Sequence, residues 1–180
     1  MTPPQKAHAA ALAPLTAVVD AVPRWEDPSP CEGWTARDVL HHLVTTEHDF
    51  LTQHGAAPGP VAELGDDPAA AWRAHAAEVS RLLGREEVVG TTFDGFFGPT
   101  TVGEAFVAFY VWDMVVHRWD LARASGVDAG LTDAELDQVE RGADGFGPAL
   151  HMDGICAPAL DVPADAGRVT RVLARVGRRA

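Results

Sequence analysis

The sequence predicts an all-α fold: a four-helix bundle with an additional helix and an irregular C-terminal tail. Three observations support this prediction. Apolar residues recur every three or four positions in several long segments, which is the spacing of one helix face. Loops rich in proline and glycine separate these segments. Helix-capping patterns, in which a threonine stands three residues before Asp or Glu, open three of them.

The N-terminal half contains three predicted helices. The first covers Gln5–Val22, has its apolar residues on one stripe and ends before Pro23. The second covers about Thr35–Gln53, and Thr35 caps its N-terminus. The third is rich in alanine and covers Pro68–Leu83. These segments supply three of the four bundle helices.

The C-terminal half contains the fourth bundle helix and the outer parts. Arg85–Pro99 is rich in β-branched, aromatic, glycine and proline residues, which favours a long loop or a short hairpin. The longest predicted helix covers Thr101–Ser125, with Gly126 as its stop. A capping box opens a further helix over about Thr132–Gly142, and a short last helix is expected over Arg168–Val176.

Composition excludes several classes of function. The chain has 180 residues, which we interpret as a single domain over residues 1–180. A formal net charge of -12 disfavours binding to the phosphate backbone of nucleic acid. No apolar run is long enough for a membrane helix. No signal peptide is evident and there are two cysteines, so we expect a reduced, cytoplasmic protein.

Lys6 is the only lysine, which is typical of GC-rich genomes such as those of actinobacteria. A bundle of this size is compatible with a homodimer.

Asp113 and His117 are the first candidates for chemistry. They are four residues apart in a predicted helix, so both side chains lie on one face and can hold one divalent ion. The same spacing also suits an ordinary hydrogen-bonded Asp–His pair without a metal. An open catalytic zinc site usually needs a third protein ligand, which bundles take from a facing helix. His41, His42 and His48 in the second predicted helix are candidates, and periodicity does not choose between His41 and His42.

Two motifs resemble a known family. PSPCEGWTARDVLHHLV, from Pro28 to Val44, and DMVVHRWDLARASG, from Asp113 to Gly126, resemble the two signatures of the mycothiol-dependent maleylpyruvate isomerase-like proteins. These proteins belong to the DinB-like superfamily of metal-binding four-helix bundles. The resemblance implies that His42, Asp113 and His117 are the metal ligands. Two imidazoles and a carboxylate suit zinc, and also nickel, iron or manganese.

The resemblance also implies a reaction class. We expect a divalent-metal-dependent enzyme of small-molecule thiol chemistry, a mycothiol-dependent S-transferase or isomerase acting on an electrophilic substrate. The substrate is expected to enter at the mouth of the bundle, near Phe93–Phe97. We expect the second, C-terminal domain of the isomerases to be absent, so maleylpyruvate is not assigned as substrate. One alternative is a non-catalytic metal-binding helical module, and another is a structural Asp–His pair with no metal.

Several other residues are candidates for catalysis or for contacts with the metal ligands. Tyr110 and Glu47 are candidate catalytic residues. The simpler interpretation of Tyr110 is core packing. The simpler interpretation of Glu47 is a structural role or a contact with a metal ligand. Asp38, Glu47 and Asp120 are candidate partners of the ligating histidines. Cys31 has no histidine or lysine beside it in the sequence, so structural burial is expected.

The remaining motif, histidine and tail residues are interpreted as scaffold or surface. Trp34 is expected to staple the entry to the second helix, and Thr35 to cap it. The tail arginines are interpreted as a solvated face: Arg168, Arg171, Arg175, Arg178 and Arg179. The other histidines are expected to be on the surface or hydrogen-bonded: His8, His48, His54, His75 and His151.

Overall fold

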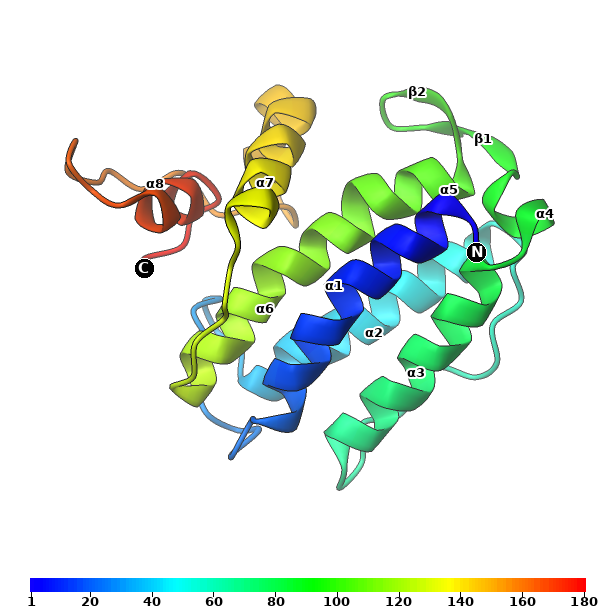
Figure 1. The fold of residues 1–180 in the computed structure, drawn as a ribbon, viewed down its shortest axis with the longest axis horizontal. Helices are drawn as coiled ribbons and strands as arrows, with labels where there is room; N and C mark the ends of the chain where they lie inside the picture. Colours follow the sequence, from blue (N-terminus) through cyan, green and yellow to red (C-terminus); the bar gives the residue numbers. More distant parts are fainter.

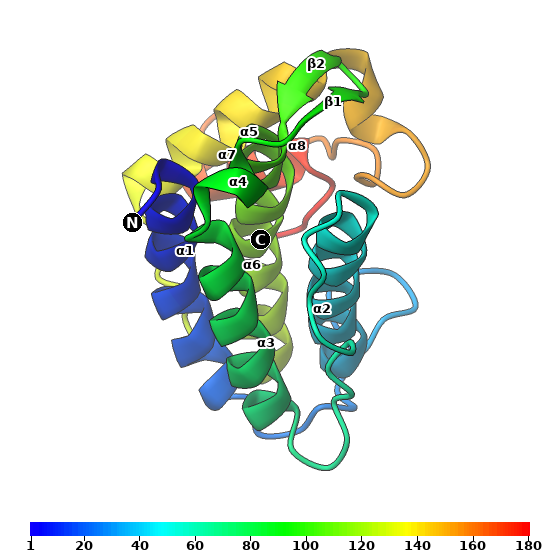
Figure 2. The ribbon, with the colours of Figure 1, turned by 90° about the vertical axis from the view of Figure 1, so that its right-hand side faces the viewer.

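Four long helices form the bundle, which confirms the all-α prediction. The computed structural model describes all 180 residues. Its bundle helices are α1 (Pro3–Asp20), α2 (Ala36–Gln53), α3 (Pro68–Leu83) and α6 (Trp112–Ser125). Helix α1 packs on α3 and α6, and α2 packs on the other side of the same two helices (Figures 1 and 2). The α2–α6 contact is the one that positions the candidate site.

The segment between α3 and α6 folds into a short helix and a hairpin. Helix α4 (Glu86–Val89) is followed by strands β1 (Thr92–Gly95) and β2 (Gly98–Thr101). The strands pair in antiparallel register, with Phe93 opposite Thr100. The hairpin is therefore the correct one of the two predicted alternatives, while α4 was not predicted. Its four residues are too few for a periodic pattern to be recognised.

The predicted long helix is continuous but is not α-helical throughout. Helix α5 (Val102–Ala105) leads into η1 (Phe106–Val111), a stretch of π-helix, which continues directly into α6. Such π segments are rare and often occur near functional sites. Gly126 ends α6 with a left-handed φ of 68°, which confirms the predicted stop.

The C-terminal part packs outside the bundle. Helix α7 (Asp133–Phe146) lies on α6, and α8 (Arg168–Arg175) lies on α7 (Figure 1). A short 3₁₀ turn, η2 (Gly147–His151), follows α7, so this helix ends beyond the predicted Gly142. The expected additional helix and tail are both present.

One apolar core holds the helices together. It contains 40 buried residues, among them Leu15, Leu40, Leu43 and Leu121, which are almost completely inaccessible. Burying one leucine side chain stabilises a fold by about 1.5–3 kcal/mol, so this core fixes the relative positions of the helices. None of the helices combines the length and the hydrophobicity that crossing a bilayer requires.

Candidate metal centre

The three predicted metal ligands lie together between α2 and α6. His42 Nε2 is 3.0 Å from one carboxylate oxygen of Asp113, and His117 Nε2 is 3.4 Å from the other. One potential ligand atom from each residue lies within 4.8 Å of the other two. This spacing is compatible with one divalent ion. Their assignment as metal ligands stays a prediction.

Local sequence explains this convergence. On α2, Val39, Leu40 and Leu43 form the buried stripe, and His42 sits half-buried beside it. His41 is exposed, whereas His42 contacts Asp113, so the geometry favours His42 of the two alternatives. Asp113 and His117 share a face of α6 because they are one helical turn apart.

The cluster is open on one side. The side chain of His117 is 6% exposed, whereas those of His42 and Asp113 are 27% and 23% exposed. The indole ring of Trp34 covers the two imidazoles, with ring centroids 5.1 Å from His42 and 6.2 Å from His117. Trp34 therefore contacts the candidate site, a role that the predicted helix staple did not include. His42 and Asp113 therefore form the solvent-accessible side of the cluster.

Asp120 supports His117 from behind. Its Oδ2 is 2.8 Å from His117 Nδ1, so the other ring nitrogen, Nε2, is directed at Asp113. A ligating histidine usually has such a carboxylate partner, which fixes the orientation of its ring. Of the three predicted partners, Asp120 is correct and Asp38 is wrong. Asp38 is exposed and caps α2, accepting a hydrogen bond from the backbone of Thr35 at 2.8 Å.

Arg178 from the tail neutralises Asp120. Its Nη2 donates to Asp120 Oδ2 at 3.0 Å, and its Nη1 donates to the carbonyl of Val176 at 2.7 Å. Arg178 is 8% exposed, so the prediction of a solvated arginine face is wrong for this residue. Burial alone would raise the pKa of Asp120, but the hydrogen bond from His117 and the charge of Arg178 lower it to about 2. Asp120 thus stays ionised behind His117.

The charges also shift the pKa values of the candidate ligands. Burial alone would lower the pKa of His117, but the Asp113 charge and the hydrogen bond to Asp120 raise it to about 10. Burial alone would raise the pKa of Asp113, but His117 and His42 lower it. In the metal-free chain, a protonated His117 therefore bridges two ionised carboxylates, Asp113 and Asp120. A metal ion at this position would replace the proton on Nε2.

Cys31 lies beside this network, which the sequence did not reveal. Its Sγ donates to Asp120 Oδ2 at 3.3 Å, and Arg178 Nη2 approaches the sulfur at 3.7 Å. Cys31 is half-buried, and together with His117 and Asp120 it forms a second group whose ligand atoms lie within 4.8 Å of one another. Structural burial is the expectation for Cys31, but the residue is only half-buried, and its neighbours His117 and Arg178 are distant in sequence. Cys156 contacts the same guanidinium at 3.7 Å.

Glu47 lies elsewhere, deeper in the core. It is fully buried, and its Oε2 is 2.8 Å from His75 Nε2 on α3. Glu47 therefore pairs with a core histidine and does not hold a metal ligand. His8 is also buried, and neither of its ring nitrogens has a partner. Burial lowers the pKa of His8, which favours its neutral form, and the expectation of a surface or hydrogen-bonded residue is wrong for it.

Tyr110 packs into the core at the edge of the site. Its ring centroid lies 4.8 Å from that of Phe50 and 5.2 Å from that of Phe106. Burial raises the pKa of the phenol, and the charges of Asp113 and Glu47 raise it further. The packing supports the simpler interpretation of Tyr110, and the phenol stays protonated.

Comparisons with known proteins agree with the motifs. A family model described as the mycothiol maleylpyruvate isomerase N-terminal domain matches residues 6–122. Two uncharacterized proteins, from two strains of Mycobacterium tuberculosis, are each 32% identical over 114 residues, which is 63% of this chain. The match spans 60% of the length of these relatives. No solved structure matches the chain significantly. The family match includes the three candidate ligands and Asp120, and Arg178 lies outside it.

Proposed function

Because the chain belongs to the mycothiol maleylpyruvate isomerase N-terminal domain family, we propose that it is a divalent-metal-dependent enzyme of small-molecule thiol chemistry. Its reaction is a mycothiol-dependent S-transfer or isomerisation of an electrophilic substrate. The observation that carries this proposal is the convergence of His42, Asp113 and His117, with Asp120 behind His117.

The donor set suits a catalytic metal ion. Two imidazole nitrogens and one carboxylate oxygen leave coordination positions free, as catalytic zinc sites do. The partial exposure of His42 and Asp113 lets a second molecule reach those positions. Zinc fits this donor set, and nickel, iron and manganese accept the same ligands.

Each residue around the ion has a separate task. When bound, a divalent ion lowers the pKa of a coordinated thiol or water and so supplies a nucleophile near neutral pH. Asp120 orients the ring of His117 and increases the basicity of the ring nitrogen that would bind the metal. Arg178 offsets the charge of Asp120, and Trp34 limits the access of water to the two imidazoles. Mycothiol, as the family's thiol, is the expected cosubstrate.

Two measurements on the zinc-loaded chain test this proposal: thiol consumption detects S-transfer, and conversion of maleylpyruvate detects isomerisation, which returns the thiol unchanged. Mycothiol and a panel of electrophiles, namely maleylpyruvate, an epoxide and an alkyl halide, would be incubated with wild type, His117→Ala and His41→Ala. His41 is the matched control, because it is an exposed histidine adjacent to His42. We expect turnover in wild type and His41→Ala and its loss in His117→Ala. A zinc-loaded wild type that turns over none of the pairs would contradict the enzyme proposal and favour a non-catalytic metal-binding module.

A further inference from the structure

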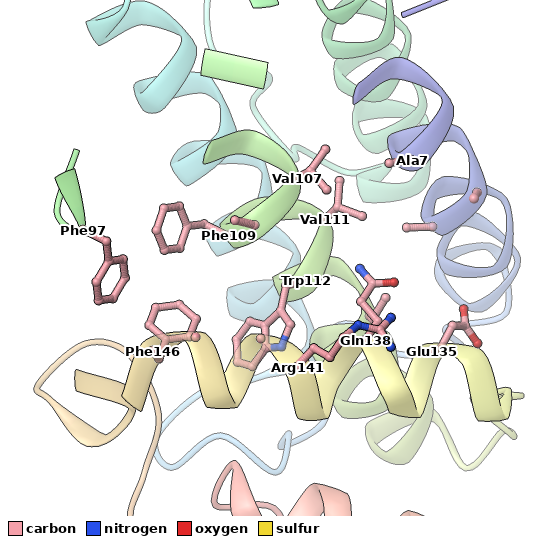
Figure 3. A pocket seen from close by; sticks show the side chains of 16 residues that line it. Ala7, Phe97, Val107, Phe109, Val111, Trp112, Glu135, Gln138, Arg141 and Phe146 are labelled. Carbon is pink, nitrogen blue, oxygen red and sulfur yellow. The ribbon is translucent and has the colours of Figure 1, made fainter. Parts of the chain in front are cut away.

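One hollow of the molecule lies away from the candidate metal centre. It has a volume of about 640 Å³ and lies between α1, η1, the start of α6 and α7, with Phe97 of the hairpin tip at one end (Figure 3). Val115, which lines the hollow, is two residues from Asp113 and two residues from His117 in α6. Two residues correspond to a rotation of roughly 200° about the helix axis. The hollow and the candidate ligands therefore occupy opposite sides of α6.

Aromatic rings form one end of the hollow. Figure 3 shows Phe97, Phe109, Phe146 and Trp112 along it. The ring centroid of Phe146 lies 5.4 Å from those of both Phe109 and Trp112. Alanines of α1, including Ala7 and Ala10, make up part of the opposite wall. These surfaces suit the apolar body of a small molecule, and the volume lies within the range of ligand pockets.

The hollow is formed before any ligand enters. Trp112 Nε1 donates to the carbonyl of Val139 at 3.1 Å, which fixes the indole against α7. Gly142 makes this contact feasible, because a Cβ at this position would lie 2.2 Å from Trp112 Cδ1. The aromatic wall is therefore held by contacts within the protein, which reduces the entropic cost of binding.

The polar residues of the hollow belong to α7 and are unequally paired. Glu135 accepts from both terminal nitrogens of Arg118, at 2.7 and 2.8 Å, so its charge is compensated. The other four acidic residues of α7 also form ion pairs: Asp133, Asp137, Glu140 and Asp144. Arg141 is the only basic residue of this helix, lines the hollow beside Gln138, and forms no ion pair (Figure 3). The hollow is thus lined by one positive charge without a carboxylate partner, carried by an exposed residue.

We propose that this hollow binds a small carboxylate with an apolar body. The body packs against Phe109, Trp112 and Phe146, and the carboxylate accepts hydrogen bonds from the Arg141 guanidinium. Arginine matches a carboxylate because its planar fork can donate two hydrogen bonds at once. Gln138, next to Arg141, adds an amide donor. The site is separate from the metal centre and its occupancy does not require the ion.

Isothermal titration calorimetry of the full chain with octanoate and octanamide tests this proposal. The two probes share an apolar body, and octanamide lacks the charge. We expect octanoate to bind wild type and Arg141→Gln to weaken it about tenfold, the loss expected for a charged hydrogen bond. Octanamide should bind wild type and Arg141→Gln equally. Arg123→Gln, which removes an exposed arginine outside this hollow, should change neither.

A second variant separates the hollow from its charge. Ala10 is exposed on α1, so Ala10→Trp fills the hollow without entering the core. It should abolish binding of both probes while the melting temperature and zinc content stay unchanged. Equal octanoate affinity in wild type and Arg141→Gln would overturn the proposal. So would an absence of binding together with a dimer that Ala10→Trp converts to monomer, because the hollow would then be an interface between two copies.

Discussion

The guanidinium of Arg178 holds the carboxylate of Asp120 at 3.0 Å, although the two residues are 58 positions apart in the chain. Asp120 in turn contacts His117 at 2.8 Å, so the tail reaches the candidate metal centre through one carboxylate. This relationship makes the tail part of the site's support. It also explains how a buried aspartate stays ionised next to a candidate ligand.

Replacing Arg178 should weaken metal binding. In Arg178→Gln, Asp120 loses its positively charged partner, and the hydrogen bond between Asp120 and His117 changes as a result. Removing a direct partner of a metal ligand typically costs roughly 10–100-fold in metal affinity, and Arg178 acts through such a partner, so we expect a loss of about tenfold. Chelator competition would measure the zinc affinity, and Arg179→Gln is the control because Arg179, the arginine next to Arg178, is exposed. An affinity equal to wild type in Arg178→Gln would show that the tail does not support the site.

Zinc binding should release a proton near neutral pH. The pKa of His117 is about 10 in the metal-free chain, so its imidazole is protonated at pH 7 and must lose a proton to become a ligand. Calorimetry in buffers of different ionisation enthalpy counts the protons released. We expect the zinc affinity to rise as the pH increases towards 10. A proton count of zero in wild type would contradict the assigned charge state of His117.

The same raised pKa predicts how the stability of metal-free protein depends on pH. A histidine whose folded pKa exceeds its unfolded value of about 6.5 stabilises the fold fully below that value. The contribution is lost as the pH rises from there through about 10. Urea unfolding of metal-free wild type should therefore show a decline across this range. His117→Gln, which carries no titratable imidazole, should decline less.

Two glycines of α7 should respond oppositely to alanine. A Cβ at Gly142 would lie 2.2 Å from Trp112, whereas a Cβ at Gly145 meets nothing within 4 Å. Gly142→Ala should destabilise the protein by about 1–3 kcal/mol through overpacking. Gly145→Ala should stabilise it by roughly 0.5–1 kcal/mol, because alanine is the better helix former. Thermal unfolding measures both, and a stabilised Gly142→Ala would refute the close Trp112 contact.

Glu47 should matter for stability and not for the metal. Glu47→Ala leaves His75 without its partner in the core, and removing one member of a buried pair costs about 3–5 kcal/mol. Glu47→Gln keeps a hydrogen-bonding oxygen and should cost less. Urea unfolding gives the two values, and elemental analysis gives the zinc content. A loss of zinc in folded Glu47→Gln would instead connect this residue to the metal centre.

The fold was largely predictable from local patterns. Apolar stripes and the capping residues Thr35, Thr101 and Thr132 define helices that begin where they were predicted to begin. The π-helical turn at η1 was not predictable, because its residues carry the same apolar pattern as the adjoining α-helix. Helix α4 was missed because one turn of helix has no periodicity.

The candidate site was predictable only in part. Asp113 and His117 follow from i, i+4 spacing, while the choice of His42 over His41 needed the family resemblance. Arg178 was missed because nothing in its own segment indicates that it returns to α6. The half-buried position of Cys31 next to His117 depends on the loop before α2, which short-range patterns do not fix.

Zinc X-ray absorption spectroscopy on the zinc-loaded full chain tests the central claim most directly. Two overlapping groups compete for an ion, since His117 belongs both to the set with His42 and Asp113 and to the set with Cys31 and Asp120. We predict a shell of nitrogen and oxygen ligands at about 2.0–2.2 Å, unchanged in Cys31→Ser and lost in His42→Ala. A sulfur ligand at about 2.3 Å, or a folded wild type that binds no zinc, would contradict the account.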